Sequence, residues 1–228
     1  MRSNGLWLIA DRAAMLASDP IVARYKDALV LGALREDVLR IPGTTKVIEH
    51  LSFSHFYKPP LPGGFLPLLW PGPRFKANRF FARALAHGRT AAGFVQLGRA
   101  VHLLADMSCP VHVHRAIHDG DPYEWWVEGN VKTLASLPIP SVPSIVRASD
   151  AIEGMARQTV SFRADRTNHH AGRVLRRLGV LRPVKASEAG AQARVLVPLA
   201  IAWAGALLRV FLSRSQAKTP VTSRTLSV

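Results

Sequence analysis

Apolar residues recur at helical spacing along most of the chain. This periodicity predicts helices over residues 6–17, 21–34, 75–86, 90–108, 121–134, 144–160 and 186–212, with a further short segment over residues 44–51. Pro20 and Pro122 stand in the first turn of two of these helices, where the missing N–H is tolerated. Val, Ile and Tyr do not alternate with polar residues over any five positions, so no sheet is predicted. The pattern predicts an all-α, multi-helix bundle.

The length of 228 residues and an apolar fraction of 48% fit one domain with one hydrophobic core, spanning residues 1–228. Residues 58–74 form a proline- and glycine-rich loop, longer than most loops of compact domains. The apolar residues at positions 61–70 suit a lid or a lipid-facing rim, and simple packing over the core is the alternative. We expect residues 186–213 to form a core helix and residues 214–228 to form a disordered tail.

Residues 195–208 are the one candidate for a membrane span. This apolar run contains Pro198, ends before Arg209, and is shorter than the roughly 20 residues that a span needs. We therefore expect a buried helix, with a membrane span as the alternative. Residues 1–8 lack an apolar core long enough for a signal peptide.

The chain is strongly basic, with 30 Lys and Arg against 15 Asp and Glu and a net charge of +15. Such an excess favours anionic partners such as nucleic acid, anionic lipid surfaces or anionic substrates, and a solvated basic surface is the alternative. The denser basic patch at residues 163–185 carries no aromatic residue, so it does not predict a base-stacking platform. Cys109 is the single cysteine, which excludes an intramolecular disulfide and a multi-cysteine zinc site.

Ionisable side chains interrupt the apolar sequence of the central predicted helix and the segment after it. His102 and Asp106 are four residues apart, so both leave the same helix face, and His112 follows just beyond Pro110. Burying so many ionisable groups is costly unless they are paired or bind a metal. Zinc takes imidazole and carboxylate ligands, usually four. The candidate ligands are Asp37, His55, His102, Asp106, His112, His118, Asp121 and Glu124.

Each of these residues also has a structural alternative. A single histidine in an apolar setting is more often a hydrogen-bonded core residue than a ligand, and Asp106 or Glu124 could form a structural pair or a helix cap. The number of such residues between His102 and Glu124 is what favours a metal site.

Three segments, taken together, are specific to one family. They read Gly32-Ala-Leu-Arg-Glu-Asp37, then Ser54-His55-Phe56-Tyr57, then Leu97-Gly98-x-x-x-His102-x-x-x-Asp106-x-x-x-Pro110-x-His112 with Tyr123-Glu124 and Val127 following. In this order they resemble the bacterial zinc-dependent phospholipase C family, whose superfamily includes the single-strand-specific nucleases of fungi and plants. The likeness covers roughly residues 6–135.

The resemblance implies a helical fold that holds three zinc ions and hydrolyses phosphate esters. It implies that Asp37, His55, His102 and Asp106 hold the first zinc, that Asp106 bridges to another, and that His112 and Glu124 belong to a second. The family's other ligand there is a histidine four residues before the glutamate, where this chain has Gly120. We expect His118 to substitute, with Asp121 next. His114 and Glu128 are further candidates, as ligands or as groups that orient a ligand.

The third zinc of the family is held by the amino group and carbonyl of an N-terminal tryptophan and by a histidine in a Thr-His segment. Here that segment aligns with Asn4-Gly5, and Trp7 is internal. Either the natural start lies upstream, or this site has been lost. We expect two zinc ions, and three if the N-terminal ligands lie upstream. The family is usually secreted, and the chain as given leaves its localisation open.

The predicted function is that of a phospholipase C-like phosphodiesterase, a hydrolase in which zinc acidifies a water and Asp37 orients or deprotonates it. The expected substrate is an anionic phosphoester, with a phospholipid and peripheral membrane contact favoured by the apolar loop. A single-strand nuclease of the same chemistry is one alternative. A non-catalytic member that only binds zinc or membranes is another. No protein partner is evident.

Overall fold

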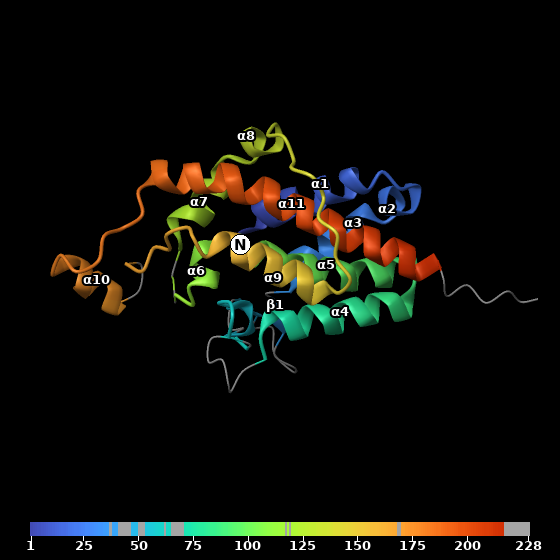
Figure 1. The fold of residues 1–228 in the computed structure, drawn as a ribbon, viewed down its shortest axis with the longest axis horizontal. Coiled ribbons are helices and arrows are strands. Elements are labelled where there is room, and N and C mark those ends of the chain that lie inside the picture. Colours follow the sequence, from blue (N-terminus) through green and yellow to red (C-terminus); the bar gives the residue numbers. More distant parts are fainter. Residues whose placement is uncertain are drawn as a thin grey trace, which may run out of the picture.

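The computed structural model describes residues 1–36, 38–40, 47–49, 53–61, 63–64, 71–116, 118, 120–167 and 170–216. Helices build the body of the molecule and lie side by side along its long axis (Figure 1). Its longer helices are α1 (Ser3–Ala17), α3 (Lys26–Arg35), α4 (Pro73–His87), α5 (Ala91–Asp106), α9 (Ala148–Thr159) and α11 (Ala186–Gln216). The shorter ones are α2 (Pro20–Arg24), η1 (Phe53–His55), α6 (Pro110–Val113), α7 (Pro122–Gly129), α8 (Val131–Ala135) and α10 (His170–Arg177). The predicted all-α fold is confirmed.

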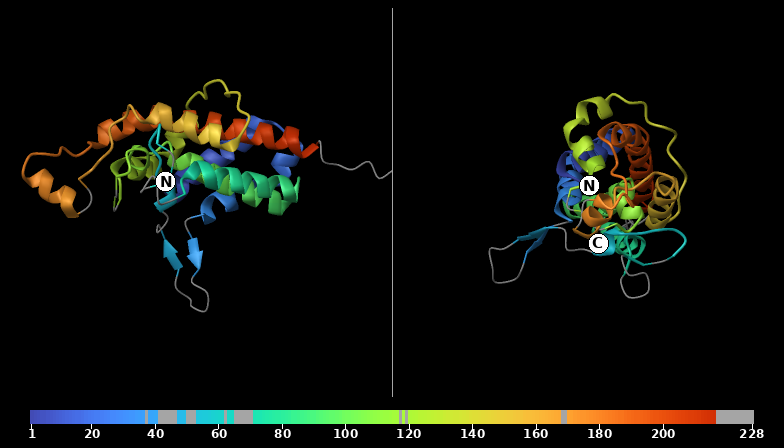
Figure 2. Two further views of the ribbon diagram at one scale, coloured as in Figure 1. Left: turned by 60° about the horizontal axis from the view of Figure 1, so that its bottom comes forward. Right: turned by 90° about the vertical axis from the view of Figure 1, so that its left-hand side faces the viewer.

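Two short strands depart from the sequence prediction. β1 (Val38–Arg40) pairs with β2 (Val47–Glu49) in an antiparallel ribbon, with Val38 opposite Glu49. Figure 2 shows this ribbon standing away from the helical body. The prediction that the chain contains no strand was therefore wrong at this place. The β-branched pair Val47-Ile48 favours an extended backbone, but strands of three residues are too short to show alternation.

Helix α5 lies at the centre of the fold, and two glycines bring it close to α3. A Cβ atom added to Gly98 on α5 would lie 2.0 Å from the carbonyl oxygen of Leu29, and one added to Gly32 on α3 would lie 2.1 Å from that of Val95. Only glycine allows the two backbones to approach this closely. The approach also sets the position of the last turn of α3 against the part of α5 that carries His102.

Helix α11 is long and apolar enough to cross a membrane, but much of it lies inside the fold. Its most apolar 18-residue window is 67% buried, and the core helix of a globular protein can have the same length, composition and burial. It packs against α1, α7 and α9. This burial agrees with the expected core helix, and α11 continues to Gln216, three residues into the expected tail.

Two predicted helices are each divided. The segment 21–34 forms α2 and α3, which meet at Tyr25, and the segment 121–134 forms α7 and α8, which meet at Asn130. The Asn130 side chain donates to the Trp126 carbonyl oxygen at 2.8 Å, which satisfies a carbonyl at the end of α7. Of the expected lid at positions 61–70, residues 62 and 65–70 lie outside the described residues.

Candidate metal centre

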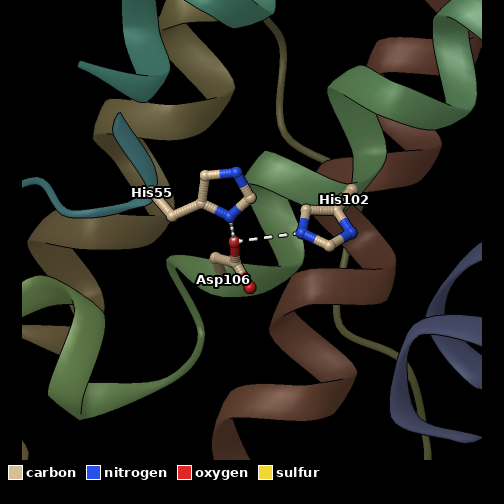
Figure 3. A group of neighbouring side chains, drawn as sticks. All are labelled: His55, His102 and Asp106. Carbon is tan, nitrogen blue, oxygen red and sulfur yellow. Dashed lines mark hydrogen bonds and ion pairs between the residues drawn. The ribbon is translucent and has the colours of Figure 1, made fainter. Parts of the chain in front are cut away.

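Helix α5 and the short helix η1 bring two histidines to one carboxylate. His102 and Asp106 lie one turn apart on α5, both completely buried, and His55 reaches them from the end of η1 (Figure 3). Asp106 Oδ2 lies 2.7 Å from His55 Nδ1 and 3.3 Å from His102 Nε2. The helical spacing therefore places this pair as the sequence predicts, and η1 supplies the second imidazole.

The ring of His102 is oriented by the last turn of α3. Its Nδ1 lies 2.7 Å from the Ala33 carbonyl oxygen, which can only accept, so Nδ1 carries the proton. Ala33 is in the last turn of a helix that ends at Arg35, where carbonyls have no helical partner. Nε2 is consequently directed at Asp106, and in the neutral ring it carries the lone pair that can bind a metal ion. A hydrogen bond of this kind is typical behind a metal-bound imidazole.

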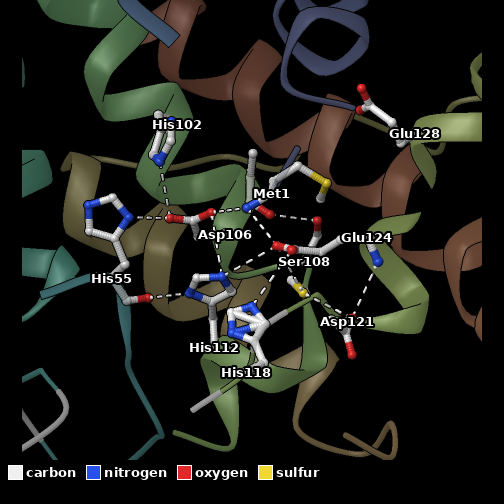
Figure 4. A network of polar contacts seen from close by, with 12 residues as sticks. Met1, His55, His102, Asp106, Ser108, His112, His118, Asp121, Glu124 and Glu128 are labelled. Carbon is white, nitrogen blue, oxygen red and sulfur yellow. Dashed lines mark hydrogen bonds and ion pairs between the residues drawn. The ribbon is translucent and has the colours of Figure 1, made fainter. Parts of the chain in front are cut away.

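A second group of donors lies beside the other oxygen of Asp106 (Figure 4). His112, on α6, has its Nε2 atom 3.9 Å from Asp106 Oδ1 and 3.6 Å from Glu124 Oε1, and Glu124 is on α7. Its Nδ1 lies 3.2 Å from the His55 carbonyl oxygen and so donates to it. The same arrangement as at His102 therefore directs Nε2 of His112 into the cluster. Asp106 lies between the two groups, one oxygen toward each.

His118 and Asp121 complete the surroundings of Glu124. His118 Nε2 lies 3.7 Å from Glu124 Oε2, and its ring stands edge-on to that of His112 at 5.1 Å. Asp121 is the N-cap of α7, where its side chain accepts from the Glu124 backbone N–H at 3.3 Å. His118 is thus placed where it could bind a metal ion. Asp121 instead uses one oxygen to cap the start of the helix that carries Glu124.

The α-amino group of Met1 is the cation that these carboxylates share. It lies 2.7 Å from Asp106 Oδ1 and 2.8 Å from Glu124 Oε1. Burial raises the pKa of Asp106, but the Met1 ammonium and then the imidazoles of His102 and His112 outweigh burial and hold that pKa well below its ordinary value. The pKa of Glu124 is also lowered: burial raises it, but the Met1 ammonium and then His112 lower it by more than burial raises it. Both carboxylates therefore remain ionised inside the fold and attract positive charge.

The pKa of Asp121 moves in the opposite direction. Burial, and then the charge of Glu124, raise it to about 7. A buried carboxyl group beside an ionised one is more easily kept neutral. In the metal-free protein Asp121 is consequently only partly charged near neutral pH.

Other predicted site residues lie elsewhere. His114 Nε2 donates to the Phe162 carbonyl oxygen at 2.8 Å, and its ring lines a pocket of about 390 Å³ with Arg163, Arg166 and Arg182. Glu128 accepts from the Asn4 backbone N–H at 2.9 Å and so fixes the start of α1. Asp37 lies outside the described residues. Of the N-terminal segment considered for a third zinc, Trp7 is 46% exposed.

Cys109 and the Met1 amino group are the two members of this site that sequence reasoning missed. Cys109 is fully buried, and its Sγ atom lies 3.7 Å from Asp121 Oδ2 and 3.8 Å from Glu124 Oε1. Burial first, and then the charges of Glu124 and Asp121, raise its pKa well above the ordinary value. Its position between Asp106 and His112, next to Pro110, was the available signal.

The donor atoms fit a zinc ion in type and in spacing. Among the described residues, two groups each have their ligand atoms within 4.8 Å of one another: His55, His102 and Asp106 form one, and Cys109, His112 and Glu124 the other. Bonds of about 2.0–2.2 Å to a tetrahedral ion place two N or O ligands about 3.4 Å apart. The imidazole–carboxylate distances of 3.3 and 3.6 Å agree with this value. The His55 contact of 2.7 Å is a direct hydrogen bond, which must lengthen if both groups bind one ion.

Comparison with known proteins identifies the fold. No protein-family model and no curated protein matches the chain. Among solved structures, the alpha-toxin of Clostridium perfringens from avian strain SWCP aligns with a TM-score of 0.64 at 15% identity, over 95% of this chain and 66% of that one. The alpha toxin of Clostridium absonum aligns with a TM-score of 0.68 at 14% identity, over 96% of this chain and 67% of that one. The chain has the alpha-toxin fold.

The chain spans about two thirds of the length of these toxins, so the alpha-toxin fold accounts for nearly all of this protein but only part of them. At identities of 14% and 15% the likeness concerns the fold. It supports, at that level, the resemblance seen in the three sequence segments. Within the alpha-toxin fold, the donors gather where α5, η1, α6 and α7 meet.

Proposed function

We propose that this protein is a zinc-dependent hydrolase of phosphoric esters, a phosphodiesterase of the phospholipase C kind. One observation carries the proposal: buried Asp106 has two imidazoles at one oxygen and a second group of donors beside the other. Such an arrangement suits two metal ions that share a carboxylate. The alpha-toxin fold supports the proposal, as do the segments that resemble zinc-dependent phospholipases C.

The residues divide between two ions. His55, His102 and Asp106 would hold one, together with Asp37 as the resemblance implies. His112, His118 and Glu124 would hold the other, with Asp106 bridging. Zinc bound by such donors supplies Lewis-acid chemistry: it acidifies water and stabilises negative charge on a phosphoryl group.

The chain's own residues orient this centre and keep it dry. The Ala33 and His55 carbonyls fix the rings of His102 and His112, so that each presents Nε2. The buried side chains of α5 exclude water from behind the site, which strengthens its electrostatic interactions. Asp37, a ligand by the resemblance, would orient or deprotonate the attacking water. The net charge of +15 favours the approach of an anionic ester.

The preferred substrate is a phospholipid, and the net charge gives a reason to test single-stranded nucleic acid as the second candidate. One zinc-loaded preparation should be assayed on phosphatidylcholine vesicles and on single-stranded DNA. Release of the phosphorylated headgroup supports the lipid proposal, and cleavage of DNA alone would replace it with a nuclease. Cleavage of neither would leave a non-catalytic zinc-binding protein.

Two variants make the assay specific. His102→Ala removes a fully buried donor and should abolish hydrolysis. His87→Ala removes an exposed histidine at the end of α4 and should leave hydrolysis unchanged. Equal turnover by both variants would refute the assignment of His102.

A further inference from the structure

The second group of donors lacks the ligand that the resembling family would supply. A histidine four residues before Glu124 would fall at Gly120, whose φ of +98° is a conformation that side chains rarely adopt. A Cβ atom there would lie 2.8 Å from Trp125 Nε1. The turn before α7 therefore disfavours a histidine at this position, and the shell needs other donors.

Cys109 is placed to be one of them. It is the N-cap residue of α6 and is fully buried. Its thiol contacts the carboxylates of Asp121, the N-cap of α7, and of Glu124, in the first turn of α7. A thiol that only filled space in the core would have apolar neighbours. The Cys109 sulfur lies 3.7 Å from Asp121 Oδ2 and 3.8 Å from Glu124 Oε1, two long and weak contacts, and its single proton can be donated to only one of these oxygens at a time.

The distances match the coordination shell of one ion. A Zn–S bond of about 2.3 Å and a Zn–O bond of about 2.1 Å, at the tetrahedral angle, place sulfur and oxygen about 3.6 Å apart. Cys109 Sγ lies 3.8 Å from Glu124 Oε1, and His112 Nε2 lies 3.6 Å from that same oxygen. The three ligand atoms also lie within 4.8 Å of one another. Three donors of different chemistry thus lie close enough together to bind one ion.

The charge around this position favours a cation. Asp106, Asp121 and Glu124 are all buried within a short distance of the thiol or of its neighbour His112. Buried carboxylates are costly unless they are paired or coordinate a metal. In this structure the Met1 ammonium pairs with Asp106 and Glu124, and a divalent ion between Cys109, His112 and Glu124 would compensate the same carboxylates in its place.

We propose that Cys109 is a thiolate ligand of the second metal ion, which it binds together with His112, Glu124 and the bridging Asp106, in place of His118. Binding forms the sulfur–metal bond and releases the thiol proton to solvent. A sulfur donor selects borderline and soft divalent ions, such as zinc, cobalt and cadmium, over magnesium and calcium. The inference rests on the proposed metal centre, and it is independent of whether the centre hydrolyses a lipid.

Cobalt(II) substitution tests the ligand without any activity assay. Metal-free protein should be titrated with Co²⁺ while absorption is recorded in the near ultraviolet, where thiolate-to-cobalt charge transfer appears, and in the visible, where all tetrahedral cobalt absorbs. Cys109 is the only cysteine of the chain, so a charge-transfer band can have no other source within it. The wild-type protein should show both absorptions.

Two variants provide the comparison. Cys109→Ser should lose the charge-transfer band and keep visible absorption from the site around His102. Ser108→Ala removes a neighbouring hydroxyl, which donates to the Ala105 carbonyl oxygen, and should keep both absorptions. If Cys109→Ser does not fold, the wild-type spectrum alone decides the question.

The outcomes separate this inference from the proposed function. Visible cobalt absorption without charge transfer in the wild-type protein would overturn the thiolate ligand and leave the metal centre standing. No cobalt binding at all would overturn both. A charge-transfer band in a protein that hydrolyses no phosphodiester would support the ligand and contradict the proposed function.

Discussion

The contact between α3 and α5 is predicted to control the metal centre as well as stability. Substitution Gly98→Ala adds a methyl group that would lie 2.0 Å from the Leu29 carbonyl oxygen and 2.8 Å from the Ala33 backbone nitrogen. Both atoms belong to backbone, so the clash cannot be relieved by a side-chain rotation. The helices must separate by about 1 Å or more before this methyl group reaches ordinary van der Waals contact.

Separation of the helices carries two costs. Overpacking of this kind destabilises a protein by about 1–3 kcal/mol. For a chain of this size each kcal/mol lowers Tm by about 2–4 °C, which gives an expected decrease of about 2–12 °C. The Ala33 carbonyl would also move away from His102 Nδ1, now at 2.7 Å. Loss of such an orienting hydrogen bond weakens metal binding by about 10- to 100-fold.

Thermal unfolding and competitive zinc titration measure the two effects on the same samples. The matched control is Gly129→Ala, because a Cβ atom at Gly129 meets nothing within 4 Å. This control should retain the zinc affinity and the Tm of the wild-type protein, or gain slightly in Tm because alanine is the better helix former. A Gly98→Ala protein with wild-type Tm and wild-type zinc affinity would refute the proposed role of this contact.

Three further predictions concern the cluster itself. In metal-free protein the raised pKa of Asp121, about 7 against 3.8, makes the folded state lose stability as pH rises from 4 to 7, by up to about 4 kcal/mol. Asp121→Asn, which retains an N-cap, should abolish that loss in denaturant unfolding, and an unchanged pH dependence would contradict the assignment. Asp106 and Glu124 have lowered pKa values, so their ionised forms stabilise the folded state above the unfolded pKa values of 3.8 and 4.5, and this stabilisation is lost as pH falls below those values. Asp106→Asn should therefore make the free energy of unfolding less sensitive to acid. An unchanged acid transition in this variant would count against the assignment. Chelation of the metal should lower Tm and added zinc should restore it, whereas a Tm indifferent to chelator would argue that no structural metal is held.

The sequence predicts some parts of this site well because they depend on local periodicity. The four-residue spacing of His102 and Asp106 fixes a shared helix face, and Pro110 predicts the break after which His112 turns back toward the cluster. Asp121 before Pro122 is a recognisable helix start, and in the structure its side chain caps α7. Each of these features follows from a few neighbouring residues.

Other parts could not be predicted because they depend on contacts between distant segments. The distance from His102 to Ala33 joins residues on two helices, and nothing local indicates that the Ala33 carbonyl would orient the ring. The ribbon of β1 and β2 is too short to show a strand pattern. Cys109 looked unimportant because a single cysteine excludes the familiar multi-cysteine sites, and only the fold brings it to Glu124.

In the proposed function, the residues around Asp106 would hold two zinc ions that the hydrolysis of a phosphodiester requires. The most direct test adds zinc stepwise to metal-free protein and measures, in the same samples, bound zinc per chain and the hydrolysis of phosphatidylcholine. We predict no hydrolysis without metal, an increase that saturates at two zinc ions per chain, and no recovery in His102→Ala. Hydrolysis that is independent of zinc, or saturated zinc binding with no hydrolysis of lipid or of single-stranded DNA, would contradict the claim.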